Sequence, residues 1–333
     1  MLTALVETDM RPVDDPAPLL EIEHLEVAFG HRSGSTAVLG VHDVSIRVAP
    51  GETLGIVGES GCGKTMTAMA MLGLLPDQAA VTAGTISWKG HPLDSREATR
   101  LRGRAIALIP QDAMTALNPL LTVERQISEV LRKHRHLRRS EARARVHELL
   151  ELVRIDEPKR VAAQRPWQLS GGMAQRVVIA MAIAAEPDLL IADEPTTALD
   201  VTVQSEILAL LQGLQSDLGL AMIMITHDLG VVAHLAHRTA VMYAGRVVES
   251  GPTSEVFDSP AHPYTRGLIR STPQPFRPQR LAGISGQAPL LLVQSEGCSY
   301  RDRCDVASPS CDIRPSLVND DATSREVACW HAN

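Results

Sequence analysis

The sequence has few aromatic residues, no long apolar run and no excess of positive charge. Aromatic side chains make up 3% of the 333 residues, so Ala, Val, Leu, Ile and Met must build the core. The longest apolar stretches, such as 177–185, fall well short of the roughly 18 residues that a membrane-spanning helix needs. The formal net charge is −7, whereas a protein that binds nucleic acid through nonspecific phosphate contacts usually carries a basic domain. These absences argue against a membrane-spanning chain and against a nucleic-acid partner.

The start of the chain lacks the basic-then-apolar order of a secretory signal. It carries Glu7, Asp9, Asp14 and Asp15 instead, together with three prolines. This composition predicts a disordered tail over residues 1–18 and a protein that stays in the cytosol.

Cysteines are few and unevenly placed. Cys62 stands alone, while Cys298, Cys304, Cys311 and Cys329 lie close to the C-terminus. Their spacing matches neither the paired C-x2-C of common zinc sites nor the run of a ferredoxin. A reducing cytosol disfavours disulfides. The chemistry therefore favours four thiolates that bind a metal, with free buried thiols and disulfides as the alternatives.

A glycine-rich string is the most specific motif that is present. It has the form Gly-x4-Gly-Lys-Thr and lies between an apolar segment, 52–57, and an expected helix, 66–75. Glycines let backbone N–H groups and a helix N-terminus face phosphates, so the string predicts a nucleoside triphosphate as ligand. Lys64 would reach the β- and γ-phosphates, and the Thr65 hydroxyl would bind Mg2+. The expected phosphate-binding residues are Gly58, Glu59, Ser60, Gly61, Cys62, Gly63, Lys64 and Thr65.

Apolar segments with strand and helix patterns alternate along the rest of the chain, which predicts an α/β fold with a largely parallel sheet. Between them, residues 122–165 show helical spacing with many charges. The basic stretch 132–139 is either a solvated helix face or a contact with acidic lipid or a partner. The expected strands are 20–29, 41–48, 81–88, 106–109, 189–192, 221–226 and 239–243, and the expected later helices are 203–218 and 229–236.

Two acidic residues end one apolar strand. Asp193 can hold Mg2+ through water, while Glu194 is placed to polarise the water that attacks the γ-phosphate. Upstream, Ser170 is a good N-cap, and Gly171 and Gly172 expose backbone N–H groups. The sequence therefore predicts a second helix start that binds anions.

These motifs, with Gln111, residues 198–200 and His227, occur in the order and approximate spacing of the ATP-binding cassette family, which the chain resembles over about residues 20–252. The resemblance implies a P-loop NTPase fold with a RecA-like core, an antiparallel β subdomain and a helical subdomain at about 112–168. It implies that Gln111 senses the γ-phosphate, that His227 holds it and that Phe29 stacks on adenine. The implied Mg2+ ligands are Thr65, Gln111 and Asp193.

In that family two cassettes pair head to tail. The resemblance implies that Ser170, Gly171, Gly172 and Asp200 of one subunit cover the ATP that the other subunit binds. Because the chain has one phosphate loop, it needs a second ATPase subunit, identical or related, to hydrolyse ATP in this way. Met173 departs from the usual Gln of the motif.

Several longer strings, 191–202, 224–229, 242–246 and 259–265, resemble the ATPases of dipeptide and oligopeptide importers. This resemblance implies an ATPase at the cytoplasmic face of the membrane, with two permeases and an extracytoplasmic substrate-binding protein as partners. It favours a [4Fe-4S] cluster over zinc in a C-terminal extension, 253–333, that follows an ATPase domain over 19–252. A nickel importer is the alternative. A soluble cassette ATPase that acts on nucleic acid or ribosomes is disfavoured. The interval from Lys64 to Ser170 has no room for the long coiled coil of repair-type relatives, and the chain has one cassette where translation-type relatives have two.

Overall fold

The computed structural model describes residues 17–30, 38–272, 283–289, 296–320 and 324–332. The predicted tail over 1–18 therefore lies outside the described residues, except for its last two positions. Within the described part of the chain, every helix is too short or too polar to cross a bilayer.

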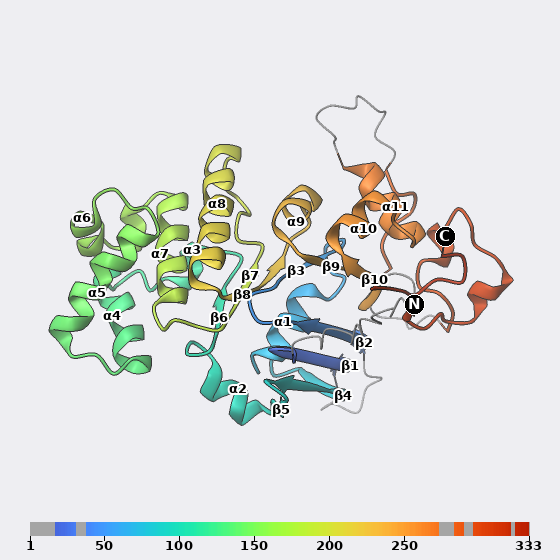
Figure 1. Ribbon diagram of the computed structural model, residues 1–333, viewed down its shortest axis with the longest axis horizontal. Helices are drawn as coiled ribbons and strands as arrows, with labels where there is room; N and C mark the ends of the chain where they lie inside the picture. The colour runs from blue at the N-terminus through green and yellow to red at the C-terminus, as the bar shows by residue number, and fades with distance from the viewer. Residues whose placement is uncertain (1–16, 31–37, 273–282, 290–295, 321–323, 333) are drawn as a thin grey trace, which may run out of the picture.

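Two sheets form the framework (Figure 1). The smaller sheet is antiparallel, in the order β2-β1-β4-β5. The larger sheet has the order β11-β12-β10-β9-β3-β8-β7-β6, and its centre, from β9 to β6, is parallel. The strands are β1 (Leu20–Phe29), β2 (Val38–Val48), β3 (Thr53–Val57), β4 (Ala79–Trp88), β5 (His91–Pro92), β6 (Ile106–Ile109), β7 (Leu189–Asp193), β8 (Ala221–Ile225), β9 (Arg238–Tyr243), β10 (Arg246–Pro252), β11 (Val318–Asp320) and β12 (Arg325–Val327).

The central strands are buried on both faces. Successive side chains of a strand point to opposite sides, and β7 divides its residues between two apolar cores accordingly. Leu190 and Ala192 pack with the helices, whereas Leu189 and Ile191 pack with the antiparallel sheet and α1. This explains why β7 is a continuous apolar run rather than an alternating one.

The helices gather into a helical subdomain and a set that borders the large sheet (Figure 1). α4 to α6 correspond to the charged helical segment expected over 122–165. Thr122 caps α4, and Asp200 caps α8. The helices are α1 (Lys64–Met71), α2 (Ser95–Leu101), α3 (Ala113–Ala116), α4 (Val123–His134), α5 (Arg139–Leu152), α6 (Pro158–Ala163), α7 (Gly171–Ile183), α8 (Val201–Leu218), α9 (Leu229–Leu235), α10 (Thr253–Asp258) and α11 (Pro263–Ser271), with 3-10 turns at Pro166–Gln168, Arg301–Arg303 and Pro309–Asp312.

The C-terminal segment continues the large sheet. β12 pairs with β10, through Glu249 opposite Val327, and β11 adds to β12. The structure therefore does not confirm the cysteine-rich extension as a distinct domain, and the predicted boundary at residues 252 and 253 stays a prediction. An extension was expected from local strings, but β-pairing with a strand more than 70 residues away has no local signature.

Most predicted elements are present with shifted ends. The strand 20–29 and the strand 106–109 have the predicted bounds. The helix expected over 66–75 begins at Lys64 and ends at Met71, because Gly73 adopts the left-handed conformation (φ 60°) that terminates helices. The elements β10, α2, α10, α11, β11 and β12 were not predicted.

Candidate nucleotide site

The phosphate-binding segment, Gly58 to Thr65, forms a tight loop between β3 and α1. A Cβ on Gly58 would lie 2.2 Å from the carbonyl oxygen of Met242, and the backbone there has φ 154°, so only glycine fits. The N-terminus of α1 has no side-chain cap, which leaves its N–H groups for an anion.

Lys64 lies across this loop and is 5% exposed. Its Nζ donates to the carbonyl oxygens of Gly58 (2.8 Å) and Glu59 (3.1 Å). Both acceptors are neutral carbonyl groups, so neither bond is an ion pair that a phosphate would have to displace. The lysine and the loop therefore form one hydrogen-bonded unit.

Thr65 and Asp193 come together at the start of α1 and the end of β7. The Thr65 hydroxyl donates to Asp193 Oδ1 over 3.2 Å. Burial raises the pKa of Asp193, and the hydrogen bond from Thr65 opposes that rise. A hydroxyl and a carboxylate are hard oxygen donors of the kind that Mg2+ prefers, so the two residues fit the ion that accompanies ATP.

Glu194 is the residue that links the most elements of the site. Its carboxylate accepts from Gln111 Nε2 (3.0 Å) and Thr197 Oγ1 (2.9 Å), and it lies 3.2 Å from His227 Nδ1. Burial acts to raise its pKa, but the hydrogen bonds of Thr197 and His227 outweigh burial, so the pKa is lowered. Glu194 is therefore an ionised acceptor beside the Asp193 carboxylate, as a residue that polarises water must be.

Phe29 lies at the end of β1, next to the loop. Its ring covers Gly40, where a Cβ would be 2.6 Å from the ring, and the Gly40 carbonyl in turn lies 2.8 Å from a Cβ position on Gly63. Only Gly40 therefore lies between the Phe29 ring, which is expected to stack on adenine, and Gly63 at the start of α1.

The second set of predicted residues lies elsewhere. The Ser170 hydroxyl accepts from Met173 N–H (3.3 Å) and caps α7, and Asp200 caps α8. Ser170, Gly171 and Asp200 are exposed. In the described part of the chain, none of these three has a hydrogen bond or ion pair with the phosphate loop or Glu194. The structure brings the first set together within one chain and leaves the second set on the surface.

Sequence reasoning missed three residues that touch the site. Thr197 donates a hydrogen bond to Glu194. It lies in the string 191–202, which indicated a resemblance to importer ATPases but no role for this residue. Tyr264 and Arg303 contact Glu59 from the C-terminal side of the chain. Tyr264 belongs to the noted string 259–265, but nothing in the local sequence marks Arg303.

The four C-terminal cysteines are free thiols, and so is Cys62 in the loop. Burial raises the pKa of Cys298, and the neighbouring thiols Cys311, Cys329 and Cys304 add to that rise. However, the described residues contain no group of three or more His, Cys, Asp or Glu side chains arranged to hold a metal ion. The structure therefore does not support the predicted iron–sulfur site.

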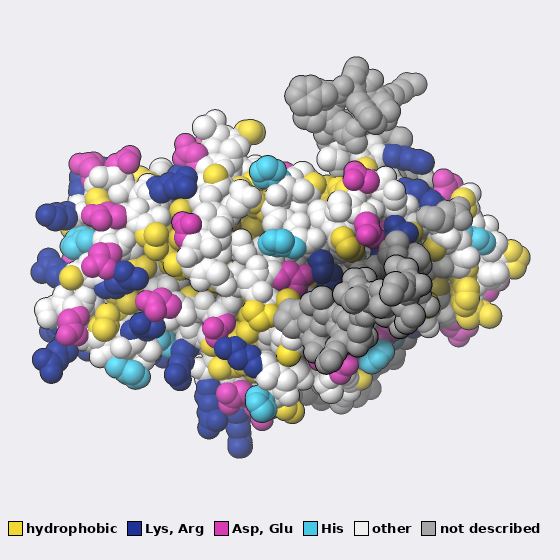
Figure 2. Space-filling view, viewed as in Figure 1, with side chains coloured by type: hydrophobic (Ala, Val, Ile, Leu, Met, Phe, Trp, Pro, Cys, Tyr) yellow, Lys and Arg dark blue, Asp and Glu magenta, His cyan; other side chains and the backbone are white. Residues whose placement is uncertain are grey.

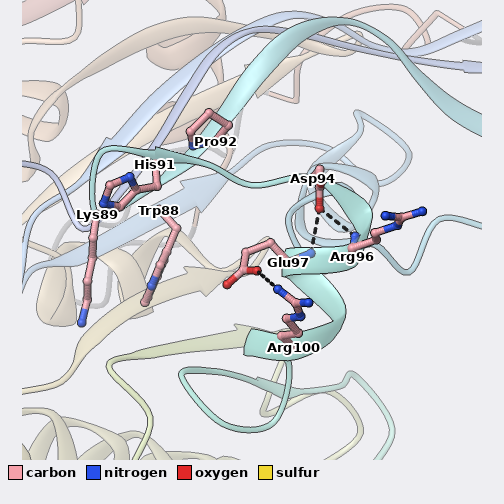
Figure 3. Close-up of a pocket in the computed structure, with 8 residues that line it drawn as sticks. All are labelled: Trp88, Lys89, His91, Pro92, Asp94, Arg96, Glu97 and Arg100. Carbon is pink, nitrogen blue, oxygen red and sulfur yellow. Dashed lines mark hydrogen bonds and ion pairs between the residues drawn. The ribbon is translucent and has the colours of Figure 1, made fainter.

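A surface cavity of about 570 Å³ is separate from the nucleotide site (Figure 3). It lies at the edge of the antiparallel sheet, between the β4–β5 turn and α2, and its charged rim includes Lys89 and Arg100. Figure 3 shows Glu97 directed at Arg100 (3.2 Å) and Asp94 at the backbone of α2. None of its lining residues belongs to the phosphate loop, and Figure 2 shows acidic and basic side chains mixed over this part of the surface.

One α/β core carries a phosphate loop, two carboxylates at the end of a strand, and an exposed helix start with a side-chain cap. This combination defines an ATP-binding cassette protein. Comparison with known proteins agrees: the ABC transporter family matches residues 41–197, and the C-terminal region of oligopeptide/dipeptide transporters matches residues 248–311. The chain belongs to the family of peptide ABC transporter ATP-binding proteins.

Individual relatives are similar over nearly the whole chain. A probable peptide ABC transporter ATP-binding protein, y4tR of Sinorhizobium fredii, is 46% identical over 321 residues, 95% of each chain. A putative peptide import ATP-binding protein of Brucella ovis is 46% identical over 310 residues, 88% of this chain and 91% of the relative. Among solved structures, a dimer of the cassette MJ0796 bound to ADP and Pi has a TM-score of 0.62 and 29% identity, over 70% of this chain and 98% of that one.

Proposed function

We propose that the chain is the ATP-hydrolysing subunit of an importer of di- and oligopeptides. The observation that carries this proposal is the match of residues 248–311 to the C-terminal region of oligopeptide/dipeptide transporters. The peptide-import names of relatives at 46% identity support the same substrate class. On this proposal the chain works at the cytoplasmic face of a membrane, with two permeases and a substrate-binding protein.

Each residue of the cluster has a role in hydrolysis. Lys64 and the N-terminus of α1 bind the β- and γ-phosphates, while Thr65, Asp193 and Gln111 hold Mg2+. Glu194 accepts hydrogen bonds in an ionised state and polarises the attacking water. Phe29 stacks on adenine, and His227 turns from Glu194 to the γ-phosphate.

The site is completed by a second ATPase subunit. The exposed start of α7, with Ser170, Gly171 and Gly172, offers N–H groups to the ATP of the partner, and Asp200 borders the same interface. The cassette MJ0796, 29% identical to this chain, was solved as a dimer bound to ADP and Pi, which supports a paired state. ATP stabilises the closed dimer because it contacts both chains, and hydrolysis removes that differential affinity.

The four C-terminal cysteines remain our candidates for a [4Fe-4S] cluster, with zinc as the alternative. Their mutual effects on pKa indicate neighbouring thiols, and cluster binding requires thiolates in one place. Anaerobically purified protein should absorb near 400 nm and contain about four irons per chain. Colourless protein with one zinc per chain would show that the site binds zinc rather than a cluster. Metal-free protein would reject both the cluster and the zinc proposal.

Transport measurements test the main proposal. Deletion of the gene should abolish uptake of labelled di- or oligopeptides, and the parent gene should restore it. Lys64→Ala should fail to restore uptake, because the ammonium that binds the phosphates is lost. Full peptide uptake in the deletion strain, with loss of nickel uptake, would identify a metal importer instead.

A further inference from the structure

Glu59, inside the phosphate loop, is held by three partners at once. Its backbone N–H donates to the hydroxyl of Tyr264 over 2.9 Å, and its carbonyl oxygen accepts from Lys64 Nζ over 3.1 Å. Its carboxylate accepts two hydrogen bonds from the Arg303 guanidinium, of 2.7 and 2.9 Å. Two of these partners come from the C-terminal part of the chain, 205 and 244 residues away.

The bond with Arg303 has the features of a strong ion pair rather than a surface contact. The Arg303 side chain is 7% exposed and that of Glu59 is 26% exposed. The pairing is bidentate, which fixes orientation as well as distance. The Glu59 hydrogen bonds raise the pKa of Arg303, so the guanidinium stays charged.

Arg303 is itself fixed from behind. Its Nη1 donates to the Tyr243 hydroxyl over 3.3 Å and its Nε to the carbonyl of Ser285 over 2.9 Å. The guanidinium carbon lies 5.7 Å from the centre of the Tyr243 ring and 6.0 Å from that of Tyr300. The arginine is therefore held by contacts outside the loop, and through it the loop is anchored to the C-terminal segment.

Tyr264 provides the second fixed point. It is fully buried at the start of α11, and its ring packs 4.5 Å from that of Tyr243 and 5.4 Å from that of Tyr300. Burial raises the pKa of its hydroxyl. The hydroxyl is thus a neutral acceptor whose place is set by the three-ring cluster.

We propose that Arg303 and Tyr264 are positioning residues for nucleotide binding: they hold Glu59 so that its carbonyl keeps Lys64 in place for the phosphates. The C-terminal segment is then a working part of the ATP site. This inference rests on ATP binding at the phosphate loop and is independent of which solute is transported.

Arg303→Ala tests the proposal in the full-length protein, with nucleotide affinity and turnover measured separately. The affinity for a fluorescent ATP analogue should fall about tenfold. The turnover rate at saturating ATP should stay within about twofold, because Glu194 and Gln111 are untouched. Arg303→Lys should fall between parent and alanine variant, since an ammonium cannot form the two-pronged bond.

Arg301→Ala is the matched control. Arg301 lies two residues earlier in the same turn, is 48% exposed and pairs with Asp312, not with the loop. Its variant should bind nucleotide like the parent. The double variant Arg303→Ala with Glu59→Gln should bind nucleotide as well as the single variant of lower affinity does, because the two changes remove the same interaction.

Tyr264→Phe keeps the ring cluster and removes the acceptor of the Glu59 N–H, so it covers the case in which Arg303→Ala does not fold. We expect its nucleotide affinity to fall about threefold in a variant that remains folded. Parent-like affinity of folded Arg303→Ala, or of Tyr264→Phe where the arginine variant does not fold, would overturn the proposal. So would additive losses in the double variant.

Discussion

The two sides of the phosphate loop differ in burial, charge and partners. The front carries Lys64, Asp193 and Glu194. Thr65 donates to Asp193, and His227, whose side chain is 64% exposed, lies 3.2 Å from Glu194. The back carries Tyr243 and Tyr264, both at most 1% exposed, packed against the C-terminal segment. The front therefore has polar groups that can bind a substrate. The polar groups on the back are already bonded within the protein.

This difference separates chemistry from support. Hydrogen bonds on the front lower the pKa of Glu194 and keep a charge ready, whereas burial on the back raises the pKa of Tyr300 to about 12 and keeps a hydroxyl neutral. Changes to Glu194 and its hydrogen-bond partners on the front should therefore alter turnover, and changes on the back should alter affinity and stability. The experiments below test that division.

The largest effect is expected for Glu194→Gln. The amide cannot accept a proton from water, so turnover should fall by about 100- to 1,000-fold while nucleotide affinity is kept. ATPase assays and nucleotide titration measure the two quantities. Glu186→Gln, which alters an exposed carboxylate paired with Arg135, is the control. Turnover within twofold of the parent would reject the role of Glu194 as the residue that polarises the attacking water.

A mixing experiment tests whether two copies share a front. Gly171→Glu places a negative charge at the exposed start of α7 and should block hydrolysis in the partner. Glu194→Gln is inactive in its own site. Random pairing of the two inactive variants gives mixed dimers in half of cases, each with one intact site, so about a quarter of parent turnover should return. An inactive mixture would contradict head-to-tail pairing between copies of this chain.

On the back, His262 should make stability depend on pH. Burial lowers its pKa from 6.5 to about 3, so between these values the unfolded chain binds more protons than the folded one. The free energy of unfolding should therefore fall as pH is lowered, by about 2 kcal/mol between pH 7.5 and pH 5.

Denaturant titrations at the two pH values measure this dependence. His262 Nδ1 accepts from Tyr264 N–H at the start of α11, and Asn can supply the same cap without titrating. His262→Asn should lose this part of the pH dependence. His91→Asn, at an exposed position, should keep it. Equal pH dependence in both variants would assign the effect to other groups.

The smallest effect is expected for Thr197→Val. Glu194 loses one hydrogen bond but keeps those of Gln111 and His227, so turnover should fall about threefold. Thr99→Val removes a comparable exposed hydroxyl, bonded to Ser95 in α2, and should leave turnover unchanged. A Thr197 variant with weaker nucleotide binding and parent turnover would contradict the division of turnover to the front and affinity to the back.

The front of the loop was predictable from sequence and the back was not. Short strings place Lys64 after a strand and Asp193 at the end of another, and parallel strands bring their carboxyl ends to one edge. Arg303 has no such pattern, because its role depends on a partner 244 residues away. The same reason explains why β12 was missed, since its pairing with β10 depends on tertiary context.

The distance in sequence between Glu59 and Arg303 has a consequence for how the protein is made. A ribosome adds roughly 5 to 20 residues per second, so roughly 10 to 50 seconds pass between synthesis of the loop and synthesis of its anchor. On our proposal the emerging chain displays a phosphate loop that cannot yet hold nucleotide firmly. Competence to bind ATP would then report that translation of the chain has passed Arg303.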